Sequence, residues 1–391
     1  MPSMSTGADV VLKVSKRAAI SPFIVMDVMR AANKRAAGGG DVLHLEVGQP
    51  STPAPAAVLA EAKAALDSDR LGYTDALGIP ELRSRIAGHY KVFYGIEVDT
   101  RRIVVTTGSS GAFLLSFLSA FDQGDRVGLA LPGYPAYKNI LAALDIEVVE
   151  IPVDGSSGFQ PSAAILEGLD VTLDGLIIAS PSNPTGSMLD AGAFALLTEW
   201  CRKNGVRLIS DEIYHGITYG PDPVTALSLD AEAIIVNSFS KYFSMTGWRL
   251  GWMILPEKLL RAAECLTQNF FISPPTLSQI AAAKVFDCYE ELDANVARYG
   301  ENRALLLDRL PGAGFEDLAP SDGAFYIYAN VAHLTNDSQE FCKSMLAETG
   351  VAVTPGIDFD PERGHRYVRF SYAGSTGEME EAAKRLKAWL K

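Results

Sequence analysis

Short, almost wholly apolar runs alternate with helix-like stretches through the middle of the chain. Seven such runs lie at residues 103–107, 127–131, 148–151, 175–179, 206–210, 233–238 and 250–255. Strands with one buried face alternate apolar and polar residues, whereas strands covered on both faces are apolar throughout. The pattern therefore predicts an α/β fold with a mainly parallel seven-stranded sheet between layers of helices.

A second, smaller α+β unit is predicted downstream. Residues 277–310 have a helical pattern and are expected to form a long spine that leads out of the sheet. Strand patterns follow at 325–329 and 367–372, and helical patterns lie between them and at the C-terminal end.

Residues before about Leu45 have no strand partner of their own in the first unit, so we expect them to pack with the C-terminal unit. The expected division is an N-terminal segment 1–46, a large domain 47–285 and a small domain 286–391.

Composition narrows the class of protein. Of the 391 residues 48% are hydrophobic and 21% charged, which is enough for a large core. The 47 acidic and 34 basic residues give a net charge of −13, which opposes binding to nucleic acid or anionic membranes. The four cysteines form no CxxC pair, so neither a disulfide framework nor a metal site is expected. Without a signal-peptide pattern, the chain is expected to be cytoplasmic.

Polar side chains follow several predicted strands, at the edge where an α/β sheet binds ligands. Gly108, Ser109 and Ser110 open a helix after the first run, where backbone N–H groups and hydroxyls favour an anion. Tyr134, between glycine and proline, is placed to stack on a planar ring. Each feature alone also fits an ordinary helix cap or a packed tyrosine.

Two further strand ends carry amide, carboxylate and phenol groups. Asn183 lies in the proline-flanked turn SPSNPTG. Asp211 and Tyr214 belong to the segment DEIYHG and offer a carboxylate and a phenol to one ligand. His215, beside them, is expected to be structural. The alternative for Asn183 and Asp211 is a turn residue and a helix cap.

The segment SFSKYFSMTGWRLG carries the strongest signal. Lys241 lies among aromatic residues, with Ser238 before it and Arg249 after it. Partial desolvation there would lower the pKa of the lysine and make its amine a nucleophile. In YVRFSY, Arg369 alternates with apolar neighbours and needs an anionic partner, either a substrate carboxylate or a structural acid.

These groups together suit pyridoxal 5′-phosphate. That cofactor needs a lysine, a carboxylate at its pyridine nitrogen, donors to its ring oxygen, an aromatic stack and a phosphate cradle. With these groups, the chain resembles the aspartate aminotransferase family, the fold type I enzymes of aminotransferase class I/II. From about Ser15 to Leu390 it carries, in the family order, LEVGQP, GYTDALGIPELR, SPSNPTG, DEIYHG, SFSKYFSMTGWRLG and YVRFSY.

The resemblance implies a pyridoxal-phosphate-dependent transaminase that moves an amino group from an L-amino acid to a 2-oxo acid by a ping-pong mechanism. It implies Lys241 as the Schiff-base lysine, Asp211 at the pyridinium nitrogen, and Tyr214 and Asn183 as donors to the ring oxygen. Tyr134 would stack on the ring. The phosphate would be held by Gly108, Ser109, Ser110, Ser238 and Arg249.

The resemblance also implies a homodimer with shared active sites. Tyr73 matches the tyrosine that reaches the phosphate in the neighbouring subunit, so we expect it nearer to the partner's Lys241 than to its own. Gly48, Asn183 and Arg369 match positions that bind the substrate, and Gly48 and Arg369 grip its α-carboxylate.

Alternatives remain open on the sequence alone. A β-lyase would use the same site, because related enzymes run other reactions on the same cofactor. An acyl-transfer reading of Ser238 and Lys241 as SxxK lacks its companion S-D-N and K-T-G elements. A non-catalytic regulator would normally carry an added DNA-binding domain.

The sequence gives one indication of the substrate. No arginine lies between Phe270 and Ala283, where aspartate-specific members read a second carboxylate, and Gln279 stands there. We therefore expect a neutral or aromatic amino acid paired with 2-oxoglutarate or pyruvate. Ile20 and Phe23 are candidates for an apolar lid over its side chain.

Overall fold

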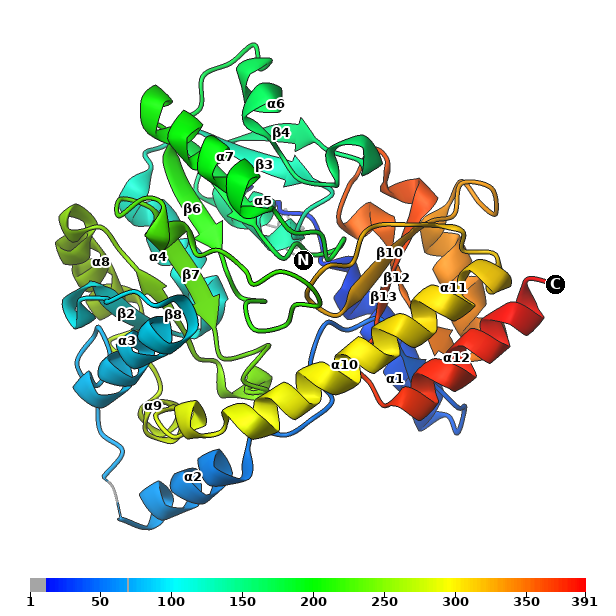
Figure 1. Cartoon of the computed structure of the whole chain (residues 1–391), viewed down its shortest axis with the longest axis horizontal. Coiled ribbons are helices and arrows are strands. Elements are labelled where there is room, and N and C mark those ends of the chain that lie inside the picture. Colours follow the sequence, from blue (N-terminus) through cyan, green and yellow to red (C-terminus); the bar gives the residue numbers. More distant parts are fainter. Residues whose placement is uncertain (1–11, 69) are drawn as a thin grey trace, which may run out of the picture.

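The computed structural model describes residues 12–68 and 70–391. Its largest element is a seven-stranded sheet with the order β2-β8-β7-β6-β5-β3-β4 (Figure 1). All neighbours pair in parallel except β8, which is antiparallel to both β2 and β7. The predicted α/β fold is confirmed. The strands are β2 (Ile103–Thr106), β3 (Arg126–Leu131), β4 (Glu147–Pro152), β5 (Gly175–Ala179), β6 (Arg207–Asp211), β7 (Ile234–Ser238) and β8 (Gly251–Ile254).

Helices cover both faces of this sheet, which explains why its strands are apolar throughout. Along β5, Ile177 belongs to a core shared with α4, α5 and α8, while Leu176 and Ile178 belong to the core on the opposite face. The large-domain helices are α2 (Ala56–Ser68), α3 (Pro80–Tyr94), α4 (Gly108–Ala120), α5 (Pro135–Ala143), α6 (Ala163–Glu167), α7 (Ala191–Asn204), α8 (Glu257–Phe270) and α9 (Thr276–Ala282).

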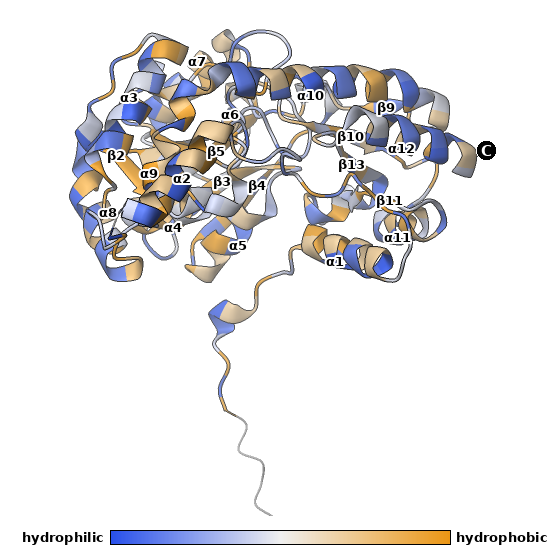
Figure 2. Cartoon of the chain, turned by 90° about the horizontal axis from the view of Figure 1, so that it is seen from below, coloured by the Kyte–Doolittle hydropathy of each residue, from blue (hydrophilic) through white to orange (hydrophobic). Residues whose placement is uncertain are grey.

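A second sheet of four antiparallel strands, in the order β12-β13-β10-β9, lies beside the first (Figure 1). It is accompanied by α11 and α12, and the long α10 leads to it from the large sheet. The elements are α10 (Tyr289–Arg309), β9 (Asp317–Leu318), β10 (Tyr326–Asn330), α11 (Ser338–Thr349), β12 (Thr354–Pro355), β13 (Tyr367–Ser371) and α12 (Thr376–Trp389). Figure 2 shows hydrophilic positions along the outer sides of α10 and α12.

The described part of the N-terminal segment packs against C-terminal elements. The strand β1 (Leu43–His44) pairs in parallel with β11 (Val351–Ala352), and α1 (Ile24–Ala37) contacts β11 and β12. Residues 1–11 of this predicted segment lie outside the described residues. The domain limits at 46 and 285 stay predictions.

The expected helical spine at 277–310 is interrupted. The helix α9 ends at Ala282, a single 3-10 turn spans Val285–Asp287, and α10 begins at Tyr289. Arg85 provides a physical reason, because its Nε–H donates to the Ala283 carbonyl at 3.1 Å and competes with continuation of the helix. Val285 is fully buried after the break, so the turn also serves the core.

Among residues 12–68 and 70–391, none of the helices has the length and apolar character that crossing a lipid bilayer requires.

Candidate active site

A cavity of about 420 Å³ lies at the carboxyl edge of the large sheet, where residues of the small domain also reach it. Most of the site residues expected from the sequence line it, although they come from segments far apart in the chain. They are Gly48, Ser109, Ser110, Tyr134, Asn183, Asp211, Tyr214, Lys241, Arg249 and Arg369. Gly108 and Ser238 lie just behind its wall, and Tyr73 does not line it.

Lys241 follows β7 and reaches into this cavity. Its Nζ donates to the Gly48 carbonyl at 2.6 Å and lies 5.7 Å from the ring centre of Tyr214. Burial, helped by the positive charge of Arg369, lowers the pKa of Lys241 to about 8, although Asp211 opposes this. A useful fraction of the amine is therefore unprotonated near neutral pH and available as a nucleophile or base.

Asp211 ends β6 and is buried. The Tyr137 hydroxyl donates to its Oδ2, and the backbone N–H of Ile213 donates to Oδ1 at 3.1 Å. Burial raises the pKa of Asp211 to about 6, while the bond from Tyr137 and the charge of Lys241 act in the opposite direction. Asp211 therefore remains mainly a carboxylate at neutral pH. The cationic group that acts on it is Lys241.

Arg369 comes from β13 and is held between two aromatic rings. Its Cζ lies 4.3 Å from the ring centre of Tyr326 and 4.7 Å from that of Phe359. It donates to Asn183 Oδ1 at 2.8 Å and to the Glu46 carbonyl at 2.5 Å, both neutral oxygens. Its Nε–H is buried with no partner among the described residues. A buried guanidinium with neutral partners suits a carboxylate ligand.

An anion cradle lies at the first turn of α4. Gly108 has φ +75° and its backbone is so close to Arg249 that a Cβ would lie 2.5 Å from Nη2. Ser109 and Ser110 follow on the helix and line the cavity. Ser238 Oγ accepts the N–H of Ser240 at 3.1 Å and thereby shapes the start of the loop after β7 that carries Lys241. Backbone N–H groups, hydroxyls and a guanidinium together fit a phosphate.

Two tyrosines of the site were missed by sequence reasoning. Tyr137 lies three residues after Tyr134, one helical turn along α5, so this spacing was a usable signal. Tyr326 had no such signal, because it looks like any aromatic residue of a buried strand. Its hydroxyl lies 2.7 Å from that of Tyr214, and it occupies the space that a Cβ on Gly48 would need. The Tyr326 hydroxyl can take this position only because residue 48 has no side chain.

The neighbours of Asp211 and Asn183 form a buried polar network behind the cavity. His215 Nε2 donates to the Ser180 carbonyl at 2.9 Å, and Tyr94 donates to Nδ1 at 2.7 Å. Burial lowers the pKa of His215 to about 4, so this histidine is neutral. It supports the loop that leads to Asn183 and does not line the cavity, in line with the structural role expected for it.

Phe23 and Ile20 differ in their positions. Phe23 lines the cavity and meets the Tyr134 ring edge-on, with ring centres 5.8 Å apart. Ile20 is 50% exposed and does not contribute to the cavity wall. Tyr73 is 83% exposed on the loop after α2, so its predicted contact with a partner subunit stays a prediction.

The fold and the site together define the class of protein. A lysine with a lowered pKa, a buried acid, the first turn of a helix and a buried arginine surround one cavity at the edge of a mainly parallel sheet. This is the architecture of fold type I enzymes.

Comparison with known proteins identifies the family. Residues 40–386 match the family model of aminotransferase class I and II. A valine–pyruvate aminotransferase of Mycobacterium tuberculosis is 53% identical over 382 residues, which cover 97% of this chain and 98% of that protein. The chain therefore belongs to the aminotransferase class I and II family and is an aminotransferase.

Solved structures agree with this assignment. The crystal structure of an aminotransferase from M. tuberculosis matches with a TM-score of 0.95 at 52% identity, covering 97% of this chain and 99% of that one. Aspartate aminotransferase from Thermus thermophilus with maleate matches with a TM-score of 0.90 at 28% identity, covering 97% and 100%. Members of the family generally depend on pyridoxal phosphate.

Proposed function

We propose that this aminotransferase uses pyridoxal 5′-phosphate to move an amino group from a neutral L-amino acid to a 2-oxo acid, through Lys241. The observation that carries the proposal is that Lys241, Asp211 and Arg369 all face one cavity. Each of the three residues matches one group that an active site for this reaction must bind. Lys241 matches an amine-reactive carbonyl, Asp211 a cationic ring nitrogen and Arg369 a substrate carboxylate.

The residues present fit the cofactor. Lys241 would hold it covalently through Nζ, Asp211 would pair with its ring nitrogen, and Tyr134 would stack on the ring. Tyr214 and Asn183 would donate to the ring oxygen. The phosphate would be held by Gly108, Ser109, Ser110, Ser238, Arg249 and Tyr73 of the partner subunit. When bound, pyridoxal phosphate supplies a carbonyl carbon that carries the amino group and a ring that accepts electrons.

The side chains of this protein supply the proton transfer and the binding. The amine of Lys241, once free, would take the proton from the substrate Cα and return it on the cofactor side, because its pKa of about 8 suits both directions. Arg369 would bind the α-carboxylate, with Asn183 and the Gly48 backbone beside it. Amino acid and 2-oxo acid would react in two successive half-reactions, which is a ping-pong scheme.

Apolar side chains support a neutral substrate. Phe23, Val25, Met26 and Val47 line the cavity from the N-terminal part of the chain. The relative from M. tuberculosis is named for valine and pyruvate. A panel of amino donors against 2-oxoglutarate and pyruvate tests this specificity. Steady ammonia release from an amino acid alone would instead indicate a β-lyase.

Replacement of the lysine tests the reaction directly. We expect Lys241→Ala to lose at least about a thousandfold in turnover, because both covalent attachment and proton transfer depend on Nζ. Borohydride reduction followed by peptide mapping should label Lys241 in the wild type and nothing in the variant. Lys91→Ala, an exposed lysine paired with Glu97, is the matched control. Undiminished turnover in Lys241→Ala would overturn the proposal.

We also propose a homodimer and a cytoplasmic location. Exposed apolar side chains gather on two adjacent loops, where Tyr73 is 83% exposed and Ile272 50% exposed. These loops are joined by a hydrogen bond of 2.6 Å from Thr276 to the Gly72 carbonyl. Such a patch suits a second copy of the chain. The four cysteines are free thiols, which fits a reducing compartment, and cell fractionation tests this location.

A further inference from the structure

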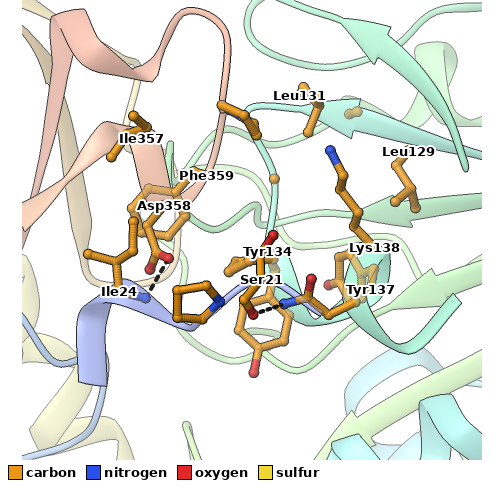
Figure 3. A pocket seen from close by; sticks show the side chains of 16 residues that line it. Ser21, Ile24, Leu129, Leu131, Tyr134, Tyr137, Lys138, Ile357, Asp358 and Phe359 are labelled. Atoms are coloured by element: carbon orange, nitrogen blue, oxygen red, sulfur yellow. Dashed lines mark hydrogen bonds between the residues drawn. The ribbon is translucent and has the colours of Figure 1, made fainter. Parts of the chain in front are cut away.

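The helix α1 is capped by a residue from the far end of the chain. Its N-cap residue, Phe23, has no hydrogen-bond acceptor in its side chain. Asp358 instead accepts the backbone N–H of Ile24 at 2.8 Å (Figure 3). It also accepts the backbone N–H of Val25, at 3.2 Å. Asp358 lies 334 residues from Ile24 in sequence and is 7% exposed. A carboxylate at this position satisfies two free donors and interacts favourably with the helix dipole.

The first turn of α1 forms a wall of the active-site cavity. Phe23, Val25 and Met26 line that cavity. Ile24 instead lines a neighbouring cavity of about 240 Å³ (Figure 3). The turn therefore separates two cavities. Its two backbone hydrogen bonds to Asp358 tie it to the C-terminal part of the chain.

The segment that carries Asp358 also contacts Arg369 and the backbone of Gly133, the residue before Tyr134. The ring of Phe359 lies 4.7 Å from the Arg369 guanidinium. The Phe359 carbonyl accepts the N–H of Gly133 at 3.1 Å, next to Tyr134. Phe23, Val25 and Met26 form what we call the apolar wall of the cavity. One short segment thus holds the apolar wall in place relative to Arg369, where the substrate carboxylate would bind.

We propose that Asp358 is a positioning residue that sets the substrate side-chain specificity: its carboxylate fixes the first turn of α1 and, with it, the apolar wall of the substrate pocket. The inference rests on the proposed function and extends it. A substrate with a branched apolar side chain would contact this wall, whereas alanine would hardly reach it. Asp358 itself does not touch the substrate.

The test compares Asp358→Asn with a matched variant, Asp337→Asn. Asp337 caps α11 through Oδ1 alone, which accepts the N–H groups of Gln339 at 3.1 Å and Glu340 at 3.0 Å. Asparagine retains such an acceptor, so Asp337→Asn removes only the charge of a cap. Asp358 accepts through both oxygens, so Asp358→Asn also loses one of its two acceptors. Asp358→Asn should lower kcat/KM for valine about tenfold, mainly by raising KM. The same variant should change kcat/KM for alanine by less than about threefold. Asp337→Asn should leave the valine-to-alanine ratio unchanged.

A second measurement keeps the proposal independent of catalysis. Hydrogen exchange at the amides of Ile24 and Val25 should become faster in Asp358→Asn and stay unchanged in Asp337→Asn. Faster exchange with an unchanged valine-to-alanine ratio would overturn the proposal, as would unchanged exchange. If the wild-type enzyme loaded with pyridoxal phosphate converts neither amino acid, the proposed function fails, whatever the exchange rates show.

Discussion

Burial determines the protonation of the groups around the active-site cavity. Removing Lys241 from water lowers its pKa to about 8, and removing Asp211 raises its pKa to about 6. The pKa values of the two groups thereby move toward neutral pH from opposite sides. For Asp211, the hydrogen bond from the Tyr137 hydroxyl is the largest influence that lowers the pKa again. For Lys241, the charge of Asp211 raises the pKa again.

Tyr137→Phe tests this residue-scale balance. Removing the donor should raise the pKa of Asp211 by about one further unit, because its carboxylate loses a direct hydrogen bond. The acidic limb of the kcat/KM profile should then move to higher pH, with a loss of about fivefold at pH 6 and much less at pH 8. Tyr328→Phe is the control, since the buried hydroxyl of Tyr328 has no partner among the described residues. An unshifted acidic limb would refute the role given to Tyr137.

At the scale of elements, the antiparallel strand β8 explains how one segment of sequence supplies two parts of the site. Lys241 follows β7, and Arg249 precedes β8. Because β8 runs back along β7, with Gly251 opposite Ser238, both residues lie at the same edge of the sheet. A parallel strand would have delivered Arg249 to the opposite edge.

Another element is anchored by a buried acid. Glu212, directly after β6, accepts hydrogen bonds from Ala226 N–H at 2.9 Å and Thr225 Oγ1 at 3.0 Å. These bonds fix the 3-10 turn Ala226–Ser228 to the end of the strand. Burial nevertheless raises the pKa of Glu212 to about 8. The carboxyl group is thus mainly protonated at neutral pH.

Glu212→Gln should change how stability depends on pH. The pKa of Glu212 is about 8 when folded and 4.5 in its ordinary state, so the folded wild type holds the extra proton between these values. Its free energy of unfolding should therefore fall as pH rises from about 4.5 to 8, by up to a few kcal/mol, and the variant should lack this loss. Urea unfolding at pH 5 and pH 8 measures it. The control Glu97→Gln, at the surface, should show the same pH dependence of the free energy of unfolding as the wild type. If Glu212→Gln also showed that dependence, the prediction would be contradicted.

At the scale of the whole molecule, the site draws on both domains and, in our proposal, on two subunits. Arg369 and Tyr326 come from the small domain, and Lys241 and Asp211 from the large one. The exposed Tyr73 is the group that a second subunit would add. Relative movement of the two sheets would therefore change the distance between Arg369 and Lys241.

A hybrid dimer distinguishes whose site Tyr73 serves. Tyr73→Phe should weaken cofactor binding about tenfold, because one phosphate hydrogen bond is lost. In a hybrid of Tyr73→Phe and Lys241→Ala subunits, the site with the intact lysine would receive an intact Tyr73 from its partner. Cofactor titration should then show wild-type affinity at one site per dimer. Weak binding in the hybrid, or a monomer in light scattering, would exclude the shared site.

Much of the fold was predictable because its signals are local. A strand covered on both faces must be apolar along its length, so the seven runs marked the sheet, and polar residues after them marked its ligand-binding edge. Lys241, Asp211 and Asn183 were found in this way. The break between α9 and α10 was not, because it depends on Arg85, which is distant in sequence and takes the Ala283 carbonyl.

Periodicity and short motifs are properties of neighbouring residues, so the sheet, the residues at its edge and the family resemblance could all be inferred from the amino-acid sequence. The distant groups that complete the site became visible only in the folded chain. Tyr326 explains why residue 48 is a glycine, and Asp358 caps a helix that begins 334 residues earlier. Such contacts depend on how two domains pack, and packing partners leave no regular spacing in a single chain.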